Sequence, residues 1–327
     1  DWSSDVCSSD LMNRTGVIYG INGPVVYIKG NTGFKMAEMV YVGKEKLVGE
    51  VIGLDKDRTT IQVFEETTGI KPGEIVEATG DAISVYLAPG ILHNIFDGIE
   101  RPLSEIAKIG GAYISRGTVV DSLDKEKLWD AHMIVKEGDR VSGGSIICEV
   151  PETKAIVHKV MVPPNLSGVL TKVMPDGQYT ICDTIAVLQL DDGTEKELTM
   201  MQKWPIRVPR PTTKRYPASK PLVTGQRILD TLFPIAKGGT AAIPGGFGTG
   251  KTMTQHQIAK WSDADIIIYI GCGERGNEMT QVLEDFSKLV DPKTGNPLME
   301  RTTLIANTSN MPRSEERRVG KECRSRW

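Results

Sequence analysis

Hydrophobic and polar residues alternate over short distances in the first quarter of the chain. The apolar and β-branched runs lie at residues 17–19, 25–28, 39–42 and 61–64. Turn residues such as Gly23-Pro24 separate these runs. Closely spaced runs of this kind predict short strands joined by tight turns. We therefore predict a small β-barrel over residues 12–78, followed over residues 79–110 by a connector that begins the next domain.

Residues 111–203 form a second β-rich region, which we predict to be an inserted, bulging domain. Its strands and glycine turns resemble a lipoyl or biotinyl carrier domain, and Lys154 falls near the position of a modified lysine. Thr153 stands where lipoyl carriers have an acidic residue, and the chain has no Met-Lys pair as in biotinyl carriers. We favour a β-sandwich with an ordinary surface lysine, and a carrier function remains an alternative.

From about residue 204 to residue 312 the pattern changes to that of an α/β domain. The expected elements are a short buried strand at 240–243, a helix that follows Gly250 and runs to about Trp261, a strand at 265–270, an amphipathic helix at about 277–290 and a strand at 302–306. The strand at 265–270 is continuously apolar, which is typical of a parallel sheet covered on both faces. Asn277 is the expected N-cap of the second helix, and Glu278 lies in its first turn.

A glycine-rich loop between the first of these strands and the first helix carries the clearest chemistry. It matches the pattern G-x-x-x-x-G-K-[ST] in full, with the residues Gly245, Gly246, Phe247, Gly248, Thr249, Gly250, Lys251 and Thr252. Glycines let successive backbone N–H groups point at phosphate oxygens, and the helix that follows directs its positive end at the same anion. Lys251 is the expected contact to the β- and γ-phosphates, and the Thr252 hydroxyl is the expected Mg²⁺ ligand.

A second polar string follows the strand at 265–270, at the edge where ligands bind in open α/β sheets. It contains Glu274 and Arg275. Beside a phosphate loop, a carboxylate such as Glu274 can polarise an attacking water, and Arg275 can hold phosphate charge. From these residues alone, a solvated turn with a surface ion pair is an equally good interpretation.

Composition excludes several classes of protein. The formal net charge of −3 gives no support for a nucleic-acid partner. No apolar run approaches the roughly 18 residues that span a bilayer, so we predict no transmembrane segment. The five cysteines show no metal-ligand spacing, which favours a reducing, cytoplasmic setting. Residues 1–11 and 313–327 have a different composition from the rest, and we interpret both as non-native segments.

Several short sequence segments near the glycine-rich loop resemble those of a known protein family. The chain resembles the rotary ATPase superfamily in TGQRILD at 224–230, LFPI at 232–235 and KGG at 237–239. The β-rich insert, WPIRVPRP at 204–211 and GCGERGNEM at 271–279 resemble, within that superfamily, the A subunit (alpha chain) of V/A-type ATPases. The complete glycine-rich loop favours the catalytic A subunit, because the paired B subunit lacks an intact loop.

The resemblance implies a fold, ligands and partners. It implies an N-terminal β-barrel, a β-rich bulge domain and an incomplete α/β P-loop domain, with ATP or ADP and Mg²⁺ as ligands. Glu274 matches the glutamate that activates the lytic water, Arg275 an arginine that faces the γ-phosphate, and Glu278 a carboxylate that holds the water shell of Mg²⁺. The implied partners are B subunits in an alternating A3B3 hexamer, central-stalk subunits and a membrane sector that moves H⁺ or Na⁺, at the cytoplasmic face of the membrane.

The family's Walker B aspartate and its adenine-contacting residues would lie beyond Met311, so we expect this chain alone to bind nucleotide weakly and to show no turnover. Two alternatives share the superfamily, a flagellar export ATPase and an F-type β subunit, and the insert argues against both. An RNA translocase similar to Rho is a further alternative, which the near-neutral charge and the lack of an aromatic and basic stripe argue against.

Overall fold

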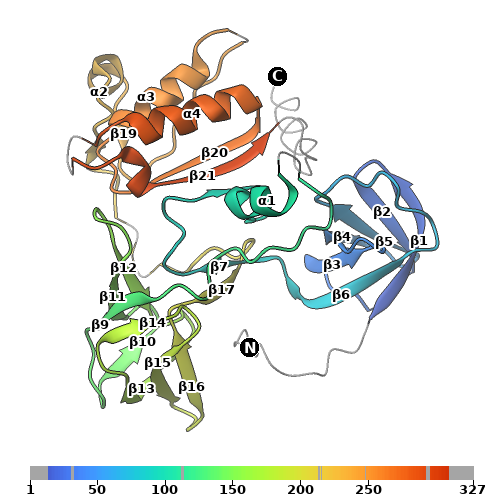
Figure 1. Cartoon of the computed structure of the whole chain (residues 1–327), viewed down its shortest axis with the longest axis horizontal. Coiled ribbons are helices and arrows are strands. Elements are labelled where there is room, and N and C mark those ends of the chain that lie inside the picture. The colour runs from blue at the N-terminus through green and yellow to red at the C-terminus, as the bar shows by residue number, and fades with distance from the viewer. Residues whose placement is uncertain are drawn as a thin grey trace.

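The computed structural model describes residues 14–30, 33–111, 114–212, 214, 216–246, 248–291 and 295–308. The two segments that we interpret as non-native, residues 1–11 and 313–327, lie outside the described residues, as does Phe247. The described chain forms a β-barrel, a β-rich insert and an α/β unit, which Figure 1 shows as three separate bodies. This arrangement confirms the predicted fold class.

The first body is a closed six-stranded antiparallel barrel with strand order β1-β2-β5-β4-β3-β6. Its strands are β1 (Thr15–Asn22), β2 (Val25–Lys29), β3 (Glu38–Val42), β4 (Leu47–Leu54), β5 (Arg58–Val63) and β6 (Ile75–Ala82). Alternate residues point inward, as the strand period of two requires. Thus Val26 and Ile28 on β2 are buried, together with Ile61 and Val63 on β5.

Two short strands frame the insert. β7 (Ser84–Leu87) precedes the insert and pairs antiparallel with β17 (Gln202–Pro205), which follows it. The chain therefore leaves and re-enters the rest of the molecule at one place. Between β7 and the insert lie β8 (Ile95–Phe96) and helix α1 (Leu103–Gly110).

The insert consists of two four-stranded sheets, with orders β10-β13-β15-β16 and β12-β11-β9-β14. Its strands are β9 (Trp129–Met133), β10 (Arg140–Ser142), β11 (Ile146–Pro151), β12 (Val157–Met161), β13 (Ser167–Val173), β14 (Gly177–Tyr179), β15 (Thr184–Leu190) and β16 (Glu195–Thr199). Apolar side chains from both sheets, among them Ile147, Leu170 and Leu188, form one buried cluster. The insert therefore has its own hydrophobic core.

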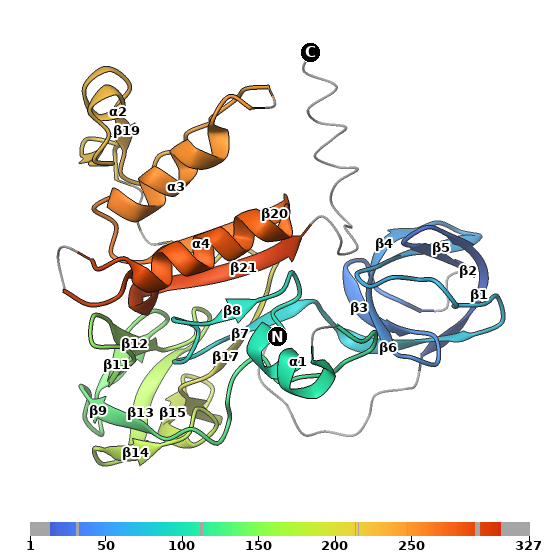
Figure 2. The ribbon, with the colours of Figure 1, turned by 45° about the horizontal axis from the view of Figure 1, so that its top comes forward.

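The α/β unit comprises β8 and the elements that follow residue 216. These are β18 (Pro221–Leu222), α2 (Arg227–Leu232), β19 (Ile235–Ala236), α3 (Lys251–Trp261), β20 (Ile267–Glu274), α4 (Gly276–Lys288), the 3-10 helix η1 (Leu298–Arg301) and β21 (Thr302–Thr308). β20, β21 and β8 form a parallel sheet with β21 in the centre. Figure 2 shows α4 lying along β20 and β21, with α3 beyond it.

Three details of this unit differ from the sequence prediction. Residues 240–246 are irregular, although a strand was predicted at 240–243. Within the described ranges no strand pairs with this segment, because β19 pairs only with β18 and the parallel sheet contains only β20, β21 and β8. The strand predicted at 265–270 runs instead over Ile267–Glu274 and is covered on one face, so that Ile268 and Ile270 stay more than 60% exposed. The N-cap of α4 is Arg275, and Asn277 lies within the first turn.

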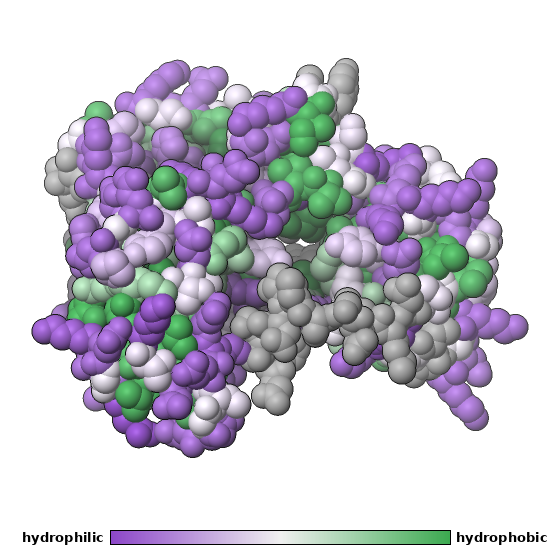
Figure 3. Space-filling model, turned by 60° about the horizontal axis from the view of Figure 1, so that its bottom comes forward, coloured by the Kyte–Doolittle hydropathy of each residue, from purple (hydrophilic) through white to green (hydrophobic). Residues whose placement is uncertain are grey.

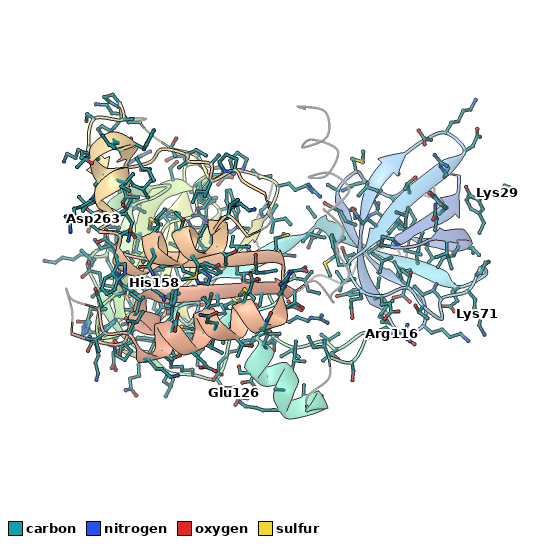
Figure 4. All side chains as sticks on the ribbon, turned by 90° about the horizontal axis from the view of Figure 1, so that it is seen from above. Lys29, Lys71, Arg116, Glu126, His158 and Asp263 are labelled. Carbon is teal, nitrogen blue, oxygen red and sulfur yellow. The ribbon has the colours of Figure 1, made fainter. Side chains whose placement is uncertain are left out.

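Polar contacts attach the barrel to its neighbours. The Arg207 guanidinium, just after β17, forms an ion pair with the buried carboxylate of Glu50 on β4. Arg116 donates a hydrogen bond to the Thr68 carbonyl, and in Figure 4 it lies on the side of the barrel that faces the rest of the molecule, opposite Lys29 and Lys71.

Hydrophilic side chains cover most of the face seen in Figure 3. In the described part of the chain, no helix is long and apolar enough to cross a membrane.

Candidate functional site

The glycine-rich loop turns sharply into helix α3. Gly248 and Gly250 have φ values of 77° and 80°, a left-handed conformation that favours glycine. Gly250 is the N-cap of α3, which begins at Lys251. Gly245 allows a close approach, since a Cβ there would lie 2.5 Å from the Thr249 hydroxyl oxygen. The shape of the loop thus favours glycine at positions 248 and 250.

Two side chains hold the loop by contacts to its own carbonyl groups. Lys251 Nζ donates hydrogen bonds of 2.6 Å to the carbonyl oxygens of both Gly245 and Gly246. The Thr249 hydroxyl donates one of 2.9 Å to the Gly246 carbonyl. The Lys251 ammonium therefore lies against the backbone of the loop.

The N-terminal end of α3 adds further donors for an anion. The first turn of any α-helix leaves backbone N–H groups without partners inside the helix, and the helix dipole makes this end positive. Lys251 and Thr252 occupy that first turn in α3, and neither is fully exposed. The end of α3 thus adds positive charge and N–H donors directly after the glycine-rich loop.

Glu274, the last residue of β20, shares a hydrogen bond with Glu278 in the first turn of α4. This hydrogen bond and burial raise the pKa of Glu274 to about 7, while the nearby Arg275 opposes the rise. The strand and helix meet closely here, because a Cβ on Gly271 would lie 2.3 Å from the Met279 sulfur. The Glu274 carboxyl therefore keeps its proton up to about pH 7.

Arg275 lies exposed in the sharp turn between β20 and α4. Its carbonyl oxygen accepts hydrogen bonds of 3.1 Å from the N–H groups of Glu278 and Met279. Asn277 Oδ1 accepts a further hydrogen bond of 3.1 Å from the Glu278 N–H. This turn fixes the backbone of Glu278 and directs the Arg275 side chain outward.

The predicted site residues fall into two groups. One is the glycine-rich loop with Lys251 and Thr252, and the other is Glu274, Arg275 and Glu278 at the β20–α4 turn. Within the described ranges, no hydrogen bond or ion pair joins Lys251 to Glu274. The roles assigned to these residues stay predictions.

Two residues without a predicted role connect these groups. His256 Nε2 on α3 lies 2.9 Å from the Tyr269 hydroxyl on β20. The histidines are scattered along the sequence, so their spacing did not indicate this contact. In the structure His256 faces inward from α3 and is 3% exposed.

The donor set at this site fits Mg²⁺. The predicted Mg²⁺ positions, the Thr252 hydroxyl on α3 and the Glu278 carboxylate on α4, both offer hard oxygen donors. Mg²⁺ in proteins is commonly held by one or two carboxylates together with water and substrate phosphates. Among the described residues no group of three or more His, Cys, Asp or Glu side chains has the geometry of a metal site. A cation here would therefore depend on the phosphate ligand as well.

A cavity of about 610 Å³ lies elsewhere, between the insert and the α/β unit. Its lining includes Glu152 and Lys154 from the turn after β11, and His93 and Glu300 from the other side. Glu152 accepts hydrogen bonds from the N–H groups of Gly90 and Leu92 and pairs with His158. Lys154 is exposed at its rim, as expected for a surface lysine.

Comparison with known proteins assigns all three bodies to one family. Residues 18–80 match the beta-barrel domain of the ATP synthase alpha/beta family. Residues 120–207 match the ATP synthase alpha/beta subunit barrel-sandwich domain. Residues 225–321, which include the glycine-rich loop, match the nucleotide-binding domain of the same family. The chain belongs to the ATP synthase alpha/beta family.

Individual relatives indicate which subunits of this family the chain resembles. The chain is 58% identical over 301 residues to the V-type ATP synthase alpha chain of Halothermothrix orenii, a match that covers 92% of this chain and 51% of that protein. It is 58% identical over 297 residues to the A subunit of the A-type ATP synthase of Methanopyrus kandleri, covering 91% and 50%. The second V-type alpha chain of Clostridium tetani is 59% identical over 302 residues. The chain thus resembles the A subunits, or alpha chains, of V- and A-type enzymes and spans about half the length of these relatives.

Proposed function

We propose that this chain is the nucleotide-binding part of the catalytic A subunit of a V/A-type rotary ATPase. The assembled enzyme would couple ATP hydrolysis or synthesis to the transport of H⁺ or Na⁺ across a membrane. The observation that carries the proposal is the glycine-rich loop, whose left-handed glycines lead directly into the positive end of α3, with Lys251 lying over them.

Lys251 and the N–H groups of the loop bind the β- and γ-phosphates of ATP or ADP. In the structure the Lys251 ammonium is satisfied by two loop carbonyl oxygens. A phosphate replaces these neutral acceptors with charged ones, and charge-assisted hydrogen bonds are the stronger kind. The short hydrogen bonds between Lys251 and the loop support this role, because they keep the ammonium close to the loop.

Glu274 is the proposed general base for the attacking water. A general base is most effective when its pKa is close to the working pH, and the contact with Glu278 raises the pKa of Glu274 to about 7. A water between Glu274 and the γ-phosphate would lose its proton to this carboxylate as it attacks. Arg275, at the same turn, is proposed to offset phosphate charge.

Thr252 and Glu278 are the proposed Mg²⁺ positions, with Glu278 acting through water. The cation, when bound, neutralises charge on the phosphate oxygens. Glu278 has its backbone fixed by the Arg275 carbonyl and Asn277 Oδ1. Loss of the proton from Glu274 adds a negative charge beside Glu278, which favours a divalent cation.

The proposed partners are B subunits in an alternating A3B3 hexamer, together with central-stalk subunits and a membrane sector that conducts the ion. The support is the likeness to proteins of V- and A-type ATP synthases over more than nine-tenths of the chain. We propose a peripheral position on the cytoplasmic face of the membrane. An acidic net charge of −3 gives no reason to add a nucleic-acid partner.

Calorimetric titration of the 327-residue chain with ADP and Mg²⁺ tests the nucleotide site. We expect Lys251→Ala to weaken binding about 10- to 100-fold, because it removes a charged hydrogen bond worth roughly 1.5–3 kcal/mol. Lys154→Ala is the matched control, since Lys154 is an exposed lysine in the insert. Equal affinities of the wild-type chain and the Lys251→Ala variant would remove the proposed site.

A further inference from the structure

His256 links the helix that follows the glycine-rich loop to the neighbouring strand. It lies on α3 five residues after Lys251 and is 3% exposed. Its Nε2 is 2.9 Å from the Tyr269 hydroxyl, and the two rings meet edge to face with centroids 5.6 Å apart. A buried polar group keeps such a partner because an unpaired one costs roughly 1–3 kcal/mol.

Tyr269 in turn contacts the elements that hold the acidic pair. It lies on β20 five residues before Glu274. Its ring packs edge to face on Phe286 of α4, with centroids 6.1 Å apart, and Phe286 is fully buried on the same helix as Glu278. Lys260 of α3 adds an ion pair of 2.7 Å to Asp285 of α4. Tyr269 therefore stands where α3, β20 and α4 meet.

We propose that His256 and Tyr269 are positioning residues, whose hydrogen bond holds α3, with Lys251 and Thr252, in fixed register against the strand that ends in Glu274. The proposal rests on the nucleotide site proposed above. A helix advances 1.5 Å per residue, so a slip of α3 by one residue would break a 2.9 Å contact. Apolar packing alone tolerates such a slip more easily, because it is not directional.

The contact is a bond between two neutral groups at working pH. Burial, and then the Lys260 ammonium, lower the pKa of His256, while the carboxylates of Asp285 and Glu278 oppose this. Burial, followed by the charges of Glu274 and Glu278, raises the pKa of Tyr269 to about 12. Between pH 7 and 9 the imidazole thus stays neutral and the phenol stays protonated, so the hydrogen bond joins two neutral groups over this range.

Four variants of the full chain test the proposal by MgADP affinity and thermal unfolding. Tyr269→Phe removes only the hydroxyl, and we expect affinity to fall about fivefold, the value of one ordinary hydrogen bond. His256→Leu should have the same effect, and the double variant should be no worse than either single one. His256→Gln, whose amide can still bond to the Tyr269 hydroxyl, should stay within about twofold of wild type.

Tyr179→Phe is the matched control, because it also loses a hydroxyl hydrogen bond, of 2.8 Å to the Pro175 carbonyl in the insert. It should leave MgADP affinity unchanged. Unchanged affinity in Tyr269→Phe, alongside a large loss in Lys251→Ala, would overturn the positioning role and leave the nucleotide site intact. A loss of affinity that tracks unfolding, or additive losses in the double variant, would also overturn it. Equal affinity of wild type and Lys251→Ala would instead remove the nucleotide site and this inference together.

Discussion

The insert and the α/β unit are built on different kinds of core. The buried cluster of the insert contains apolar residues from both sheets, such as Ile147, Leu170 and Leu188. The α/β unit has a smaller apolar cluster around Val282 and Phe286. Polar groups are buried beside it, including His256, Asp291 and Arg301. A closed apolar core needs only burial, whereas the α/β unit depends on particular polar partners. The unit that carries the proposed chemistry is therefore the one most sensitive to loss of a single polar group.

The largest expected effect is at the buried ion pair of the α/β unit. Arg301 and Asp291 have side chains that are 5% and 2% exposed, with Arg301 Nε 3.3 Å from Asp291 Oδ2. Arg301→Ala leaves the Asp291 carboxylate buried without its cation, which costs about 3–5 kcal/mol. We expect this unit to unfold while hydrogen exchange in the insert stays slow. Full protection of α4 in the variant would contradict the comparison.

The corresponding change in the insert is Leu170→Ala. Leu170 is fully buried, and its truncation costs about 3 kcal/mol through lost burial and the cavity left behind. Here we expect loss of protection in the insert alone, with MgADP affinity unchanged. Ile268→Ala on the exposed face of β20 is the control, since Ile268 is 63% exposed and its loss should cost less than about 0.5 kcal/mol.

A smaller effect concerns pH and the acidic pair. The folded chain holds its proton more tightly than the unfolded chain, because the pKa of Glu274 rises from 4.5 to about 7 on folding. This contribution to stability is complete below pH 4.5 and is lost as the pH rises through 7. We therefore expect the unfolding temperature of the α/β unit to fall between pH 5 and 8. Glu274→Gln should flatten this profile. A profile unchanged by the substitution would mean that Glu274 is not the group whose titration changes the stability.

The same titration predicts the effect of pH on ligand binding. Divalent cations compete with the proton on Glu274, so MgADP affinity should increase as the pH rises through 7. The increase should be absent in Glu274→Gln. Calorimetric titrations at pH 6 and pH 8 in one buffer series measure the change in affinity. If the increase is also seen in Glu274→Gln, the group that titrates is on the nucleotide and is not Glu274.

The smallest expected effect is at an exposed ion pair. Lys288 and Glu284 lie at the end of α4 with side chains 75% and 60% exposed. Solvent screens such pairs, so Lys288→Ala should change the free energy of unfolding by less than about 0.5 kcal/mol. Denaturant titration measures this value. A loss comparable to that of Arg301→Ala would mean that burial is not what distinguishes the two pairs.

Local pattern was sufficient for much of the fold. Strand alternation and turn residues predicted the β-rich regions, and the element that follows Gly250 was predicted correctly, since α3 spans Lys251–Trp261. The strand at 240–243 was wrong because a strand needs a neighbour, and apolar composition does not show whether one is present. The one-sided burial of β20 was missed for the same reason, since it depends on which elements pack on each face.

The candidate site was also predictable only in part. The glycine-rich loop could be predicted from the sequence, because its conformation depends on its own glycines. The contact between His256 and Tyr269 joins residues 13 positions apart on a helix and a strand. It depends on the angle between those two elements, which no spacing in the sequence reports. The raised pKa of Glu274 likewise depends on the close approach of β20 and α4, which brings Glu278 beside it.

Hydrogen exchange of the chain with and without MgADP tests the proposed nucleotide site most directly. We predict slower exchange of the backbone N–H groups at residues 245–254, where the glycine-rich loop and the first turn of α3 meet the phosphates. We predict no change in the insert, including the residues around Lys154 at the cavity. Protection confined to that cavity, or unchanged exchange at residues 245–254 under saturating MgADP, would contradict the proposed nucleotide site.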